Sequence, residues 1–234
     1  MKSSTTTIHV RFPPRMAIVL GALAVLLGQT GCGGGLKYTI DDAAMDPVSA
    51  SERQGVFESR KDVEIAEGET RTANSQLEAL ERDTDIAGKE KEQAQQEIEK
   101  AISEQEGAKA SHDENQANAA AHNKDVADLG MKVVEAKLDW LSQKKDWLKQ
   151  ARKAAQAHSE AAKARVEFEK AKVAQQKGIK PGDDFDPSNY EGQWNSKNSD
   201  WQSEKKDAES EEKDAKKKEE SWKDLATQFQ KLKG

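Results

Sequence analysis

The sequence predicts an all-α protein, with a long coiled-coil helix followed by an antiparallel C-terminal helical hairpin. Three observations support this. The chain is 34% charged and only 5% aromatic, and its helical regions are rich in Ala, Glu, Lys and Gln, all good helix formers. Small or apolar residues return every seven positions over much of the chain, as in coiled coils. No proline lies between Pro47 and Pro181, so nothing of that kind interrupts a helix there.

Two series with a seven-residue spacing run without an insertion through the first helical region. One starts at Val63 and the other at Ala66, spaced as positions a and d of one heptad frame. Ser49 and Glu52 form a capping-box pattern at the start, and Gly178 marks the end after Lys177. The frame predicts one continuous helix. A fold-back in the polar stretch 112–123 is the alternative, and it would give an elongated three-helix bundle.

Residues 178–187 read as a loop, and a second helix is predicted from there to about Leu232. Its start is signalled either by Ser188 with Glu191 or by Asp186–Pro187. A short loop between two helices predicts an antiparallel hairpin. Folding the chain about residue 181 pairs large side chains with small ones or with each other: Phe168 with Trp194, Ala161 with Trp201, Trp140 with Trp222 and Val133 with Phe229. The predicted hairpin core is Val133, Trp140, Trp147, Phe168, Trp194, Trp201, Trp222 and Phe229.

The N-terminal stretch has the features of an export signal. Three basic residues and no acidic one precede an apolar run from Met16 to Leu27, which is too short to cross a bilayer. Thr30 and Gly31 then precede Cys32, the only cysteine. This stretch resembles a bacterial lipoprotein signal peptide with its lipobox, although Gln29 stands where that motif usually has Leu. The resemblance implies cleavage before Cys32 and acylation of Cys32, for instance with palmitate; an ordinary secretory signal is the alternative.

The resemblance also implies a location and a division of the chain. Because Gly33, and not Asp, follows the cysteine, it implies an outer-membrane lipoprotein facing the periplasm; the inner membrane or a Gram-positive surface is the alternative. We expect residues 1–31 to be the signal peptide and 32–51 a lipidated flexible tether. Residues 52–132 would form an Ala-rich coiled-coil arm and 133–234 a Trp-rich hairpin. An arm without a partner in its own chain predicts a homo-oligomer or a protein partner.

Charge and motif content argue against several function classes. Loss of a basic signal takes the net charge from −6 to −9, which argues against nucleic-acid binding. His112 and His122 lie ten residues apart, about 15 Å along a helix, so they cannot share one metal ion. No arrangement typical of a catalytic site occurs in the sequence. We therefore expect no metal, no cofactor and no enzymatic activity.

These observations predict a lipid-anchored structural spacer or interaction scaffold at the cell envelope. The architecture is similar to that of the major outer-membrane lipoprotein of enteric bacteria, which implies contact with peptidoglycan. That family ends in the lysine that is joined to the wall, whereas this chain ends in Gly234, so the contact expected here is non-covalent. The alternative function is an accessory or adaptor subunit of an envelope transport or secretion machine.

Overall fold

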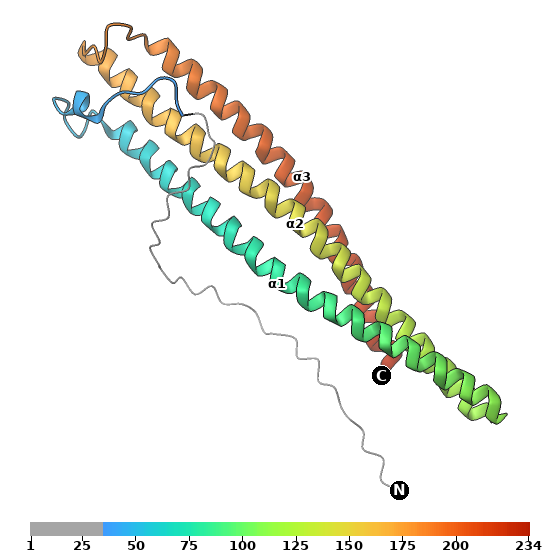
Figure 1. The fold of residues 1–234 in the computed structure, drawn as a ribbon. Coiled ribbons are helices and arrows are strands. Elements are labelled where there is room, and N and C mark those ends of the chain that lie inside the picture. The colour runs from blue at the N-terminus through green and yellow to red at the C-terminus, as the bar shows by residue number, and fades with distance from the viewer. Residues whose placement is uncertain (1–34) are drawn as a thin grey trace. The chain divides into compact units, whose positions relative to one another are not determined.

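A computed structural model describes residues 35–234 and confirms the all-α prediction (Figure 1). Leu36–Gly234 form one compact unit. The described elements are a 3-10 turn, η1 (Asp42–Met45), and three long helices, α1 (Gln54–Ser111), α2 (Glu114–Lys177) and α3 (Pro187–Lys233). None of the helices between residues 35 and 234 is long and apolar enough to span a bilayer. The predicted signal peptide and Cys32 lie outside the described residues.

The prediction of one continuous first helix is wrong, and the alternative, a three-helix arrangement, is found. The chain reverses at His112, which adopts a left-handed conformation with φ 55°. Asp113 then caps α2, because its carboxylate accepts hydrogen bonds from the backbone N–H groups of Asn115 and Gln116. The reversal lies at the start of the polar stretch that the sequence marked, and it needs neither glycine nor proline.

The central helix is α2, which packs against α1 on one side and against α3 on another, whereas α1 and α3 make little or no contact with each other. Folding back at residue 112 gives the alanine seam of α1 a partner within the same chain. Every seventh residue of α1 is buried at this seam: Ala66, Ala73, Leu80, Ala87, Ala94, Ala101 and Ala108. On α2 the buried residues of the facing series are Ala120, Ala127, Leu141, Leu148, Ala155 and Ala162.

Small residues let α1 and α2 approach closely, and three leucines are the largest fully buried side chains between the two helices. Leu80 and Ala87 of α1 form one cluster with Leu141 and Leu148 of α2, and the two α2 leucines are only 1% exposed. Ion pairs flank this seam, including Lys137–Glu90 at 2.6 Å and Arg165–Asp62 at 2.8 Å. These pairs are half-exposed, so the buried side chains supply most of the stability of this interface.

The predicted antiparallel C-terminal hairpin is present as α2 and α3. Two of the expected ring pairs occur: Trp140 stacks on Trp222 with centroids 4.9 Å apart, and Phe168 stacks on Trp194 at 5.2 Å. Two others are displaced along α2. Trp201 stacks on His158 at 4.2 Å, and Phe229 lies against Gly130. Each displacement is three residues along α2, close to one helical turn.

The helix ends follow the local signals closely. Gly178 closes α2 in the left-handed conformation with φ 67°, where a side chain would be strained. Asp186 caps α3 and Pro187 occupies its first turn, so the second of the two predicted start signals is the one in use. Ser49 and Glu52 are hydrogen-bonded to each other in the turn that precedes α1.

Candidate functional site

The segment Tyr38–Val48 is docked on the bundle, so the prediction of a flexible tether over residues 32–51 is wrong for its described part. Ile40, Met45 and Val48 are buried against the end of α2 and against Tyr190 of α3. Gln193 holds the backbone of Tyr38 with two hydrogen bonds of 3.0 Å each, one donated and one accepted. The apolar side chains were present in the sequence, but their irregular spacing gave no periodic signal.

A buried ion cluster fixes the docked segment to α2. Lys170 is 5% exposed, and its ammonium group donates to the carbonyl of Ile40 at 2.8 Å and to Glu167 at 2.9 Å. The same group lies 2.7 Å from the carboxylate of Asp42. Glu167 in turn accepts a 2.6 Å hydrogen bond from the backbone N–H of Ile40. The cluster therefore forms hydrogen bonds with both the backbone N–H and the carbonyl of Ile40, as a neighbouring β-strand would.

The cluster also perturbs two titrating groups. The hydrogen bond from Lys170 is the main cause that lowers the pKa of Asp42; the charge of Arg60 adds to it, whereas burial acts in the opposite direction. Burial, and then the nearby charge of Glu167, raises the pKa of the Tyr190 hydroxyl. Both shifts favour the charge state that the docked arrangement requires, with Asp42 ionised and Tyr190 neutral.

Docking of the N-terminal segment should weaken in acid. A carboxyl whose pKa is lowered in the folded state stabilises that state above its ordinary pKa of 3.8, and the contribution is lost as pH falls through the lower folded value. We expect hydrogen exchange of residues 37–48, corrected for intrinsic rates, to accelerate between pH 6 and pH ~3. Asp42→Asn should remove most of this pH dependence, and equal protection at both pH values in the unaltered chain would contradict the prediction.

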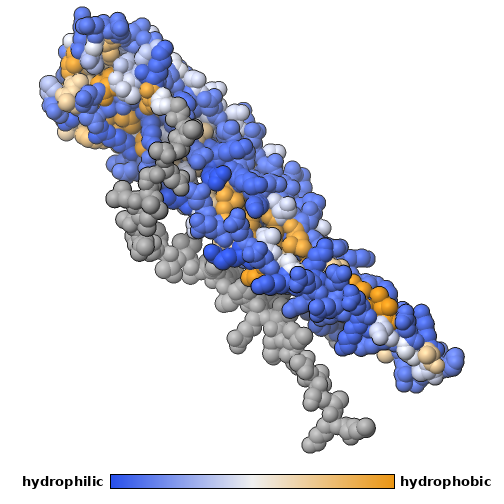
Figure 2. All heavy atoms as spheres, in the orientation of Figure 1, coloured by the Kyte–Doolittle hydropathy of each residue, from blue (hydrophilic) through white to orange (hydrophobic). Residues whose placement is uncertain are grey.

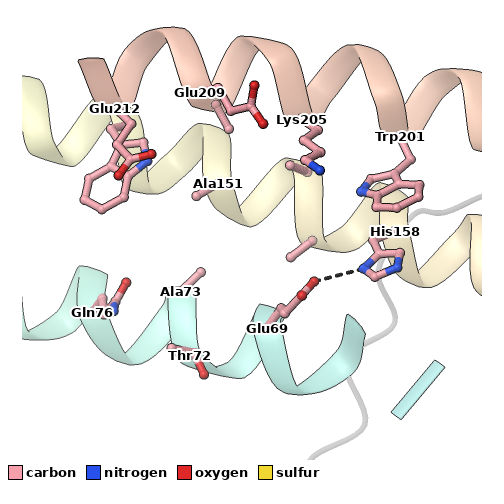
Figure 3. A pocket seen from close by; sticks show the side chains of 14 residues that line it. Glu69, Thr72, Ala73, Gln76, Ala151, His158, Trp201, Lys205, Glu209 and Glu212 are labelled. Atoms are coloured by element: carbon pink, nitrogen blue, oxygen red, sulfur yellow. Dashed lines mark hydrogen bonds and ion pairs between the residues drawn. The ribbon is translucent and has the colours of Figure 1, made fainter. Parts of the chain in front are cut away.

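A groove of about 460 Å³ lies beside α2, between α1 and α3 (Figure 3). Its floor is made of alanines, among them Ala151 and Ala73. At one end the His158 ring stacks on Trp201 within 7° of parallel, and Nδ1 of His158 lies 2.9 Å from the carboxylate of Glu69 on α1. Trp147, Glu209 and Glu212 line the same groove. This apolar floor with polar walls has the character of a helix-binding groove and lacks convergent groups for chemistry.

The surface beyond the groove is mainly hydrophilic, with apolar side chains gathered in an interrupted strip along the rod (Figure 2). Among residues 35–234, four large apolar side chains are notably exposed, and all four belong to α1: Phe57, Ile65, Ile86 and Ile102. Their positions fall outside the a and d series counted from Val63 and Ala66, so the seven-residue spacing does not reveal them.

The predicted hairpin-core residues lie along the α2–α3 seam, where all eight are half-buried. The largest fully buried side chains of the bundle are instead Leu80, Leu141, Leu148 and Ser59. His112 at the turn and His122 on α2 are both exposed. Within residues 35–234, no group of three or more His, Cys, Asp or Glu side chains could hold a metal ion. The expectation that the protein binds no metal stays a prediction.

Three comparisons with known proteins gave the same result. No protein-family model, no curated protein and no solved structure matches this chain.

Proposed function

We propose that the protein is a lipid-anchored, non-catalytic spacer or interaction scaffold of the bacterial cell envelope, held at Cys32 in the outer membrane and facing the periplasm. The observation that carries the proposal is that the docked segment lies at one end of a long rod and begins only a few residues after Cys32 in the sequence. Only the short stretch 33–35 separates Cys32 from Leu36, where the compact unit begins. This stretch can bridge no more than about 14 Å.

The geometry supports a spacer more strongly than a freely swinging domain. The docked segment and the α2–α3 loop share a hydrophobic cluster, which includes Ile40 and Phe185. The α1–α2 turn lies at the other end of α2, a helix of 64 residues and therefore about 96 Å long. An anchor at Cys32 would hold the first end near the membrane, so the turn at His112 could reach about 96 Å from it. Non-covalent contact with peptidoglycan is part of this proposal.

Acylation of Cys32 is the first expected result. Mass spectrometry of the mature N-terminus should find Cys32 as the first residue with acyl chains attached, because the basic and apolar stretches before it resemble a lipoprotein signal. Cys32→Ser should move the protein from the membrane fraction to the soluble fraction. An unmodified Cys32 in the wild-type protein, or cleavage at another position, would refute the anchor while leaving the rod intact.

A second candidate is an adaptor subunit of an envelope transport or secretion machine, and the projecting end of α1 and α2 favours it. Phe229 lies against Gly130 of α2, and α3 ends at Lys233, about one turn further on, so α3 does not reach the first turns of α2 after Glu114. This two-helix tip is free to enter a partner. Crosslinking in intact cells from Asn118 at the tip separates the two functions: a spacer gives cell-wall products, whereas an adaptor gives one defined membrane protein.

A further inference from the structure

The three helices occupy three corners of a square four-helix arrangement. On α2, Leu141 and Leu148 face α1, whereas the preceding residues Trp140 and Trp147 face α3 or the groove beside it. Adjacent residues of a helix point about 100° apart. Seen along the bundle, the direction from α2 to α1 and the direction from α2 to α3 therefore differ by nearly a right angle. The fourth corner of the square, diagonally opposite α2, holds no helix of the described chain. The groove described above is the inner side of this open corner.

One face of α1 presents a largely apolar stripe to the open corner. Its residues, here named the α1 stripe, are Ile65, Thr72, Ala79 and Ile86. Each comes directly before a residue that is buried against α2, so the stripe is turned about 100° from that seam. Thr72 lines the groove, which places the stripe on the open side. Ile65 is 57% exposed and Ile86 is 53% exposed, the largest values among the exposed large apolar residues.

The charges beside the α1 stripe have opposite signs on its two edges. The edge toward α2 carries the acids Asp62, Glu69, Asp83 and Glu90. The outer edge carries the bases Lys61, Arg82 and Lys89. Asp62, Glu69 and Glu90 contact basic groups of α2, whereas the three outer bases form no ion pair with any residue from 35 to 234. The outer edge is thus a row of cations without acidic partners in the described chain.

We propose that the α1 stripe binds the same stripe of a second copy of this chain, with the two copies parallel and in register. In a parallel pair the acidic edge of one stripe faces the basic edge of the other, because a two-fold axis along the rod exchanges the edges. Asp62, Asp83 and Glu90 then lie level with Lys61, Arg82 and Lys89 of the other copy. In an antiparallel pair each edge meets its own kind, and the like charges repel.

The parallel dimer completes the architecture of both copies. Each α1 fills the open corner of the other copy, which turns two three-helix units into two fused four-helix arrangements. Ile65 meets Ile65 and Ile86 meets Ile86, so the most exposed apolar side chains become covered. The seam between α1 and α2 within the chain likewise has one buried small or apolar residue of α1 every seven positions. The inference does not depend on the lipid anchor, although the parallel arrangement would bring both N-terminal ends to the same end of the rod.

Disulfide crosslinking tests the orientation. In the full chain with Cys32→Ser, either Ile65→Cys or Ile86→Cys alone should give disulfide-linked dimers under mild oxidation, because each position meets itself. Ser210→Cys, on an exposed position of α3 away from the stripe, is the matched control and should stay monomeric. Dimers that form only when the two stripe variants are mixed would overturn the parallel arrangement. Absence of dimers from both variants and their mixture would overturn self-association and leave a different partner.

Charge exchange provides the second test. Arg82→Glu places like charges at two symmetric positions of the dimer, so sedimentation should show a dissociation constant raised at least about tenfold. Adding Asp83→Arg to the same chain restores opposite charges and should recover most of the affinity. Circular dichroism checks that helix content is unchanged, as expected for two exposed positions. Equal affinity in all three proteins, or a wild-type chain that stays monomeric up to about 100 μM, would refute the proposal.

Discussion

Lys170→Met is expected to lower the free energy of unfolding by about 3–5 kcal/mol, the cost of removing one partner of a buried ion pair. The substitution leaves Glu167, whose side chain is 12% exposed, without its cation, and it leaves the carbonyl of Ile40 without a donor. Residues 37–48 should lose their protection against hydrogen exchange at the same time. Urea denaturation followed by circular dichroism measures the free energy, and exchange measured by mass spectrometry locates the released segment.

The neighbouring pair Lys172–Glu169 is a matched control. It has the same three-residue spacing and a distance of 3.0 Å, but the Lys172 side chain is 44% exposed. Lys172→Met should therefore cost less than about 1 kcal/mol and leave residues 37–48 protected. Similar small losses for both variants would mean that the ion cluster does not hold the segment, and that the apolar contacts of Ile40, Met45 and Val48 suffice.

Leu148→Ala is expected to cost about 3–5 kcal/mol, because it opens a cavity among the fully buried side chains of the α1–α2 seam. Leu148 is 1% exposed and packs in one cluster with Leu80 and Leu141. Trp147→Ala, at the adjacent position, should cost less, about 1–2 kcal/mol, since that ring is half-buried and borders the groove. Thermal and urea unfolding of the two variants compares them directly. A larger loss for Trp147→Ala would show that the α2–α3 seam, and not the α1–α2 seam, dominates stability.

The sequence alone determined the helical class, the hairpin formed by α2 and α3 and most helix ends, because these depend on short-range chemistry. Gly178 can adopt a positive φ, and Pro187 suits a first helical turn, whatever surrounds them. The heptad spacing of rings around residue 181 was also sufficient to predict that Trp140 meets Trp222. Both kinds of signal are local or periodic, so they can be read without knowing the fold.

Only the tertiary structure decided which partner each helix face has. A seven-residue spacing does not show whether the chain continues straight or reverses, so the heptad frame runs on through the reversal at His112. His112 adopts the left-handed conformation and Asp113 caps α2, and neither is the glycine or proline that usually marks such a turn. The two heptad series also describe only one face of each helix. The central helix α2 buries a second face against α1, and Leu141 and Leu148 lie on that face. Lys170 resembles Lys172 in sequence. It becomes a buried anchor only because a segment some 130 residues away covers it, and burial changes the energetics of a charge more than any local pattern does.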